Sequence, residues 1–236
     1  MPSFGSVMVQ LQYAVDGVES WQGKLALPLQ LTRTIPDGDF AQRRADFTLE
    51  SGESVVNFFA ADPGNTDKIW KGPADLSAKA WLGHTEDALL FRCEVADDVH
   101  DQPFLGGDSW KGDGIQVAFQ IPGQKGNWEL CLYQTNDAVT RTHLFAMPAD
   151  TGLANPWDKT PLKITRQNGK MVYEATFPYA LYGITDEILT AKGIRFNFIV
   201  NDADGKGIRE GFIRLAQGIG EGKSTEKFPV IRFKTR

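Results

Sequence analysis

The sequence predicts an all-β protein, a two-sheet antiparallel β-sandwich with little helix. Apolar and polar residues alternate with a period of two in many short segments, and Gly, Asn, Asp and Pro separate those segments. A strand places successive side chains on opposite faces, so this pattern is typical of strands with one buried face. The expected strands are 7–15, 25–31, 88–96, 115–121, 128–134, 139–145, 162–165, 171–177, 194–200, 212–215 and 230–233.

Turn residues support the antiparallel arrangement. Asn168 and Gly169 separate two alternating segments, and Asn-Gly accepts the positive φ angles of a tight hairpin turn. Segment 202–207 is expected to be another polar hairpin tip, because the Lys at its fifth position does not suit a calcium-binding EF-hand loop. Helix is expected only within 179–192, as one or two short turns closed by Gly193.

The chain of 236 residues suits one large domain, which can bury a core without a disulfide or a metal. A boundary is expected near Pro36. Residues 1–36 form strands that are either the tail of a preceding domain or an extra edge hairpin, and residues 37–236 form the main sandwich. Cys93 and Cys131 fall in expected strands, where buried free thiols are commoner than a disulfide.

The composition indicates which classes of binding partner suit the chain. The net charge is −5 and the chain has no Lys/Arg cluster, which argues against nucleic acid and fits a neutral ligand better. No apolar run approaches the roughly 20 residues that span a membrane. Residues 1–9 lack the pattern of a signal peptide, so the chain is expected to be either cytoplasmic or the mature part of an exported protein.

Five segments in order carry a family resemblance. They are 74–83, 95–100, 107–119 (with the sequence Gly-Asp-Ser-Trp-Lys-Gly-Asp at its start), 173–178 with 196–205, and Lys227-Phe228-Pro229. This order resembles family 9 carbohydrate-binding modules and their DOMON-like relatives over roughly residues 37–236. The resemblance implies a jelly-roll-like sandwich that binds carbohydrate without cutting it, attached to polysaccharide-degrading enzymes. It also implies a sugar held between two aromatic rings, and bound calcium in some members.

The chain departs from the family pattern at the sugar site. The Trp-x-x-Asp motif is present as Trp110 and Asp113. Other family positions with sugar-contacting side chains correspond to Gln116, Cys131, Ile199 and Gly222. The resemblance therefore supports the fold more strongly than the family's preference for a reducing chain end.

The predicted ligand-binding residues are Trp110, Gln116, Tyr133, Arg141 and Trp157. An aromatic face can stack on a sugar ring, and amides and hydroxyls offer both donors and acceptors to sugar hydroxyls. The alternatives are that Trp110 packs a corner of the sandwich, and that the polar residues form an ordinary solvated face.

The predicted metal ligands are Asp97, Asp98, Asp108 and Asp113, which bracket the Trp110 loop. Calcium takes several carboxylate and carbonyl oxygens, so a structural calcium site is one interpretation. The alternative is loop aspartates that make Asx-turns.

Three functions follow, in order of preference. The first is a non-catalytic carbohydrate-binding domain, secreted or on the cell surface of a bacterium, that targets covalently attached glycan-degrading domains to a polysaccharide. The second is a structural or interaction sandwich with a decayed sugar site. The third is a glycoside hydrolase or lyase, for which the sequence offers no motif: His84, His100 and His143 are scattered without metal-ligand spacing.

Overall fold

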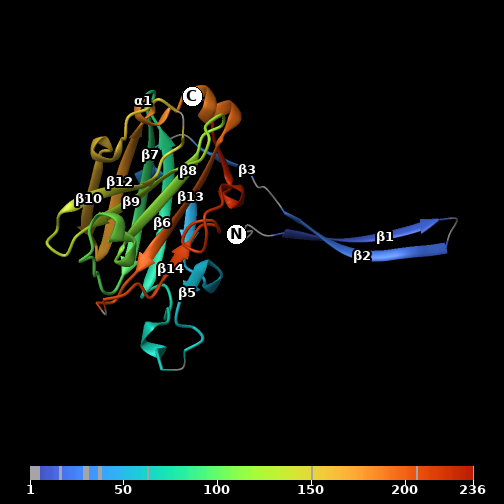
Figure 1. Ribbon diagram of the computed structural model, residues 1–236, viewed down its shortest axis with the longest axis horizontal. Coiled ribbons are helices and arrows are strands. Elements are labelled where there is room, and N and C mark those ends of the chain that lie inside the picture. The colour runs from blue at the N-terminus through green and yellow to red at the C-terminus, as the bar shows by residue number, and fades with distance from the viewer. Residues whose placement is uncertain are drawn as a thin grey trace.

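The computed structural model describes residues 6–15, 18–28, 32–36, 39–62, 64–149, 151–205 and 207–235, with the main chain alone for the first two segments and for Trp157. The predicted fold class is confirmed: two antiparallel-dominated sheets pack face to face (Figure 1). In the described part, no helix is long and apolar enough to cross a membrane.

The larger sheet has eight strands. Its main order is β10 (Thr140–Ala146), β9 (Trp128–Gln134), β8 (Gly114–Gln120), β13 (Ile194–Asp202), β14 (Gly211–Arg214) and β5 (Val55–Asn57). β15 (Val230–Phe233) pairs with β13 and, in parallel, with β3 (Thr32–Ile35).

The smaller sheet has five strands. Its order is β11 (Leu162–Gln167), β12 (Lys170–Pro178), β7 (Ala88–Asp97), β6 (Leu76–His84) and β4 (Phe47–Leu49). The periodicity did not predict β4, β5 or β6. A segment of three residues, as in β4 and β5, is too short to show alternation, and in β6 the consecutive buried residues Ala80, Trp81 and Leu82 break it.

The core lies between the sheets and follows the predicted alternation. Ile115, Val117 and Phe119 of β8 point into it, so Gln116 and Ala118 lie on the opposite face of the sheet. Aromatic rings from the two sheets meet edge to face, as the Phe91–Phe198 and Phe119–Phe177 pairs do, with centroids 5.5 Å and 5.3 Å apart. Such contacts fix the spacing of the sheets.

The predicted hairpin turn at Asn168-Gly169 is confirmed. Asn168 and Gly169 have φ angles of 51° and 77° and join β11 to β12. The expected helical turns are α1 (Tyr179–Tyr182) and a π-helical turn, η6 (Ile188–Lys192), with Gly193 at its end. The short 3-10 helices are η1 (Phe40–Gln42), η2 (Gly52–Ser54), η3 (Thr66–Lys68), η4 (Gly106–Lys111), η5 (Trp157–Lys159) and η7 (Thr225–Lys227).

The N-terminal strands β1 (Ser6–Val15) and β2 (Val18–Pro28) form a two-stranded sheet of their own. Figure 1 shows this hairpin extending away from the sandwich. The next strand, β3, pairs with β15 and so belongs to the larger sheet, although the sequence grouped it with residues 1–36.

Cys93 and Cys131 are free and buried, and they lie on different sheets. Each thiol therefore acts as a small apolar side chain, as expected for cysteines within strands.

Candidate functional site

The helix η4 carries Trp110, and two buried polar side chains hold it in place. Gln102 donates through Nε2 to the carbonyl oxygens of Ser109 at 2.9 Å and of Asp113 at 2.5 Å. The Asp113 carboxylate accepts from the amide of Ala203 at 2.9 Å, which ties this loop to the end of β13. Gly112 is needed between them, because a Cβ there would lie 2.6 Å from Gln102 Oε1. Trp110 therefore stands on a fixed support.

Trp110 forms the edge of an aromatic surface. Its side chain is 37% exposed, and Phe58, which follows β5, is 43% exposed. Between them lies the Arg209 guanidinium, 4.8 Å from the Trp110 ring centroid, 4.7 Å from that of Phe58 and 5.2 Å from that of Phe212. We call Trp110, Phe58 and Phe212 the aromatic cage of Arg209.

The face of the larger sheet that points away from the core, the outer face, is covered beside this cage. Ile219 and Phe228, from the chain between β14 and β15, pack on Ala118, Ile199 and Phe212 to form a second small core. The loop is fastened by a pair of hydrogen bonds that Asn197 Nδ2 donates to the carbonyl oxygens at positions 216 and 217, both at 3.0 Å. A ligand cannot reach the sheet surface beneath it.

Ion pairs add to this fastening. Lys223 pairs with Glu129 of β9, and Arg214 pairs with Glu221. The Glu129 side chain is buried, so its pairing with Lys223 supplies the partner that a buried carboxylate needs.

An open pocket of about 420 Å³ lies on the other side of η4. Among its lining residues are Leu105, Gly106, Tyr133, Arg141, His143 and Asp158. The Tyr133 ring is buried, and its hydroxyl accepts from the Gly106 amide at 3.2 Å. The pocket thus offers a guanidinium, an imidazole and a carboxylate at its wall.

The structure brings some predicted ligand residues together and separates others. Trp110 lies on η4, and Tyr133 and Arg141 line the pocket beside it. Gln116 is only 4% exposed and lies within the outer face, so its prediction as a ligand residue does not fit the structure. The side chain of Trp157 lies outside the described residues, although its neighbour Asp158 lines the pocket.

Sequence reasoning missed Phe58 and Arg209. Phe58 follows a strand too short to show alternation. Arg209 lies in the connection between β13 and β14, where nothing in the local pattern distinguishes a caged arginine from a solvated one.

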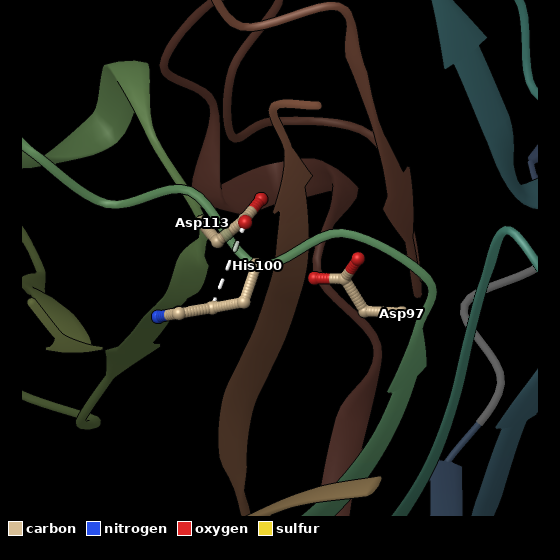
Figure 2. A group of neighbouring side chains, drawn as sticks. All are labelled: Asp97, His100 and Asp113. Carbon is tan, nitrogen blue, oxygen red and sulfur yellow. Dashed lines mark ion pairs between the residues drawn. The ribbon is translucent and has the colours of Figure 1, made fainter. Parts of the chain in front are cut away.

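An acidic cluster lies behind η4, at the end of β7 and of β13. Figure 2 shows Asp97, His100 and Asp113, with His100 Nδ1 3.6 Å from an oxygen of Asp113. The ligand atoms of three groups each lie within 4.8 Å of one another: Asp97, His100 and Asp113; Asp97, Asp202 and Asp204; and Asp75, Asp98 and Asp204.

The predicted metal set is therefore altered by the structure. Asp97, Asp98 and Asp113 all belong to these groups, but Asp108 does not. Asp108 is exposed on η4 and pairs with Lys111 at 2.9 Å. Asp202 and Asp204, expected at a polar hairpin tip, join the cluster because β13 ends beside β8 and the end of β7.

Burial and mutual repulsion shift the cluster toward protonation. Burial raises the pKa of Asp97 to about 7 and that of Asp202 to about 8, and neighbouring carboxylates add to both. Burial also holds the pKa of Asp113 well above its usual range and lowers that of His100.

These residues fit a hard divalent cation. Calcium takes six to eight oxygen ligands, and three segments of the chain supply carboxylate oxygens, through Asp75, Asp97 with Asp98, and Asp202 with Asp204. Among the described residues, no donor hydrogen-bonds to the Asp202 carboxylate, which leaves its oxygens available to a cation.

Comparison with known proteins gives a fold but no sequence relative. Neither a scan against protein-family models nor a search of curated proteins finds a match. Among solved structures, a family 9 carbohydrate-binding module from Caldicellulosiruptor kristjanssonii in complex with glucose superposes with a TM-score of 0.54 at 15% identity, over 87% of this chain and 97% of that one. The fold is that of a family 9 carbohydrate-binding module.

Two further structures agree. The module of the same organism in complex with cellotriose gives a TM-score of 0.53 at 16% identity, over 87% of this chain and 95% of that one. A protein from Bacteroides uniformis, described as a candidate carbohydrate-binding protein, gives 0.53 at 11% identity, over 86% and 98%. The resemblance to family 9 modules seen in the sequence is thus confirmed at the level of the fold.

Proposed function

We propose that this chain is a non-catalytic carbohydrate-binding domain that holds a glycan against Trp110 and Phe58. The observation that carries the proposal is the pair of exposed rings beside η4, in a fold whose solved neighbours include complexes with glucose and cellotriose. Sugar C–H groups stack on aromatic faces, and neighbouring exposed rings on one surface suit such a ligand.

The pocket beyond η4 extends this surface. Arg141, His143 and Asp158 place donors and acceptors within one wall, and sugar hydroxyls need both. A glycan that stacks on Trp110 would reach these groups with its next residues, since η4 joins the two regions.

The outer face favours the second candidate, a structural sandwich with a lost sugar site. The positions of Gln116, Cys131 and Ile199 are all buried, and Ile199 packs beneath the loop between β14 and β15. Binding at the sheet surface is therefore not part of our proposal; the ligand meets the rings and loops at its border.

Affinity gel electrophoresis with a panel of soluble polysaccharides tests the proposal. We expect at least one glycan to retard the wild type and Trp110→Ala to lose about tenfold or more in affinity, because one stacked ring carries a large share of such an interface. Met147→Ala is the control, since Met147 is an apolar side chain of similar exposure, 40%, at the far end of β10. Equal retardation of both variants would exclude Trp110 as the platform.

The cellular role follows from weak, reversible binding. We propose that the domain is secreted or displayed on the surface of a bacterium and targets covalently attached glycan-degrading domains to their polysaccharide. Co-sedimentation of the full-length protein with insoluble polysaccharide, with and without this domain, measures that contribution.

We further propose that the acidic cluster binds a structural calcium ion. Calcium would be held by the carboxylates of Asp97, Asp202 and Asp204 and would neutralise their repulsion. Calcium should raise the melting temperature and EDTA should reverse the rise. Asp202→Asn should abolish this response and Asp108→Asn should keep it, because Asp108 lies outside the cluster.

A further inference from the structure

Arg209 is a buried cation whose charge has no opposite partner. The residue is 8% exposed, and its guanidinium remains protonated at neutral pH, although burial lowers its pKa to about 10. Within the described residues no ion pair joins its guanidinium to a carboxylate.

Its hydrogen bonds are also incomplete. Nη1 donates to Asn201 Oδ1 at 2.8 Å. Nε is buried and meets no acceptor among the described residues, and the same is true of Asn201 Nδ2. Arg209 Nε and Asn201 Nδ2, two donors of residues that are hydrogen-bonded to each other, thus both lack acceptors, which is uncommon for buried polar atoms.

Nearby acidic residues do not compensate Arg209. Repulsion from other carboxylates raises the pKa of Asp97 and Asp202, and within the described part of the chain neither residue forms an ion pair with Arg209. Asp108, on the neighbouring η4, pairs with Lys111. Glu210, the next residue along the chain, has contacts of its own.

The aromatic cage attracts the guanidinium but cannot accept its remaining hydrogen bonds. Ring faces offer negative charge without a hydrogen-bond acceptor. A carboxylate, in contrast, offers two coplanar oxygens that match the planar fork of arginine. Two of the three cage rings, Phe58 and Trp110, are partly exposed, so a ligand that packs against their exposed parts lies beside the Arg209 guanidinium.

We propose that the glycan bound at this surface is acidic, and that Arg209 binds the carboxylate of a hexuronate residue whose ring stacks on Trp110 and Phe58. This inference rests on the proposed function and names its substrate class. The net charge of −5 favoured a neutral ligand, but recognition depends on the local charge, and the charge inside the cage is positive.

A matched pair of ligands isolates the carboxylate without changing the protein. Isothermal titration compares trigalacturonate with its fully methyl-esterified form, which keeps the sugar and removes the charge. We expect the wild type to bind the acid about tenfold or more tightly, as a charge-assisted hydrogen bond allows. Alginate and glucuronoxylan oligosaccharides extend the comparison to other uronates, and dextran sulfate against dextran tests a sulfate.

A matched pair of variants then assigns the preference to Arg209. Arg209→Met keeps an apolar side chain in the cage and should remove the preference for the acid. Arg44→Met removes an exposed arginine near the start of β4, on the other sheet, and should leave the preference unchanged. Circular dichroism and melting curves confirm that both variants are folded.

The outcomes separate this inference from the proposed function. Equal affinity for a uronate oligosaccharide and its methyl ester, or a preference that survives Arg209→Met, overturns the role of Arg209. Binding of dextran sulfate without any uronate overturns the carboxylate assignment. Trp110-dependent binding of neutral oligosaccharides alone sinks this inference and keeps the proposed function, whereas failure to bind any glycan sinks the proposed function itself.

Discussion

The connection between β13 and β14 carries opposite charges at its two ends, in contrasting environments. At its start, Asp202 and Asp204 crowd against Asp97, and burial with mutual repulsion raises the pKa of Asp202 to about 8. At its end, Arg209 is enclosed by aromatic rings and meets no carboxylate among the described residues. Opposite charges in one loop are thus kept apart.

A second arginine, the partly buried Arg43, forms an ion pair in the same protein. Arg43 Nη1 donates to both oxygens of Asp46, at 2.7 Å and 2.8 Å, and Nη2 donates to the Leu82 carbonyl. The fold therefore pairs a partly buried arginine where stability requires it. The separation between Asp202 and Arg209 leaves each site with a charge for an external partner, a cation at one and an anion at the other.

The acidic end should be the more sensitive to loss of a single side chain. Asp113→Ala leaves the amides of Asp101 and Ala203 without their acceptor. Each buried, unsatisfied donor costs about 1–3 kcal/mol, so we expect the free energy of unfolding to fall by about 2–4 kcal/mol. Urea denaturation measures it.

Asp108→Ala is the control for that loss. Asp108 is exposed and its pair with Lys111 contributes at most about 1 kcal/mol. Equal destabilisation by the two substitutions would mean that Asp113 does not anchor η4.

The acidic cluster should also make stability depend on pH when divalent cations are removed. Carboxyls whose pKa is raised on folding, such as Asp97 to about 7 and Asp202 to about 8, bind protons more tightly in the folded state. Their contribution is full near about pH 4 and is lost as the pH rises through these values. In EDTA, we expect the melting temperature to fall by about 3–6 °C between about pH 5 and about pH 8.5.

Calcium and Asp202→Asn should each flatten this dependence, since one neutralises the charges and the other removes one of them. A melting temperature that rises with pH in EDTA would show that the carboxylates are ionised without penalty and would contradict the contrast with Arg209.

The fold could be predicted because its signals are local. Alternation in 115–121 and 171–177 reports a face buried by a whole sheet, and Asn168-Gly169 fixes a turn by its own φ angles. The order of the matching segments added the family resemblance. Strands of three residues, β4 and β5, carry too little pattern and were missed, and β6 was missed because three consecutive buried residues interrupt its alternation.

The site could be predicted only in part because it depends on distant segments. Trp110 stands in a recognisable motif, but Phe58 and Arg209 reach it from β5 and from the connection after β13. Gln116 was predicted to bind ligand from its strand position, and only the folded structure shows that its side chain is buried. Asp202 and Asp204 likewise join Asp97 through the pairing of β13 with β8.

The smallest effect on the free energy of unfolding is expected at Arg209, at the end of the connection between β13 and β14. Arg209→Met removes one hydrogen bond and three cation–ring contacts, but it also removes the desolvation cost of an unpaired charge. Replacement of a buried ionic group by an apolar one of similar size is often near neutral, so we expect a change within about 1 kcal/mol in urea denaturation.

Arg43→Met is the matched comparison, because it strips a buried carboxylate, Asp46, of its partner, and should cost about 3 kcal/mol or more. If Arg209→Met changes the free energy of unfolding only slightly and Arg43→Met lowers it strongly, Arg209 contributes little to folding. Ligand recognition then remains as the reason for an arginine in the cage. If Arg209→Met lowers the free energy of unfolding as much as Arg43→Met does, the guanidinium stabilises the stacking of Phe58 and Phe212. Arg209 and the acidic cluster would then both serve the stability of the fold, although their charges are opposite.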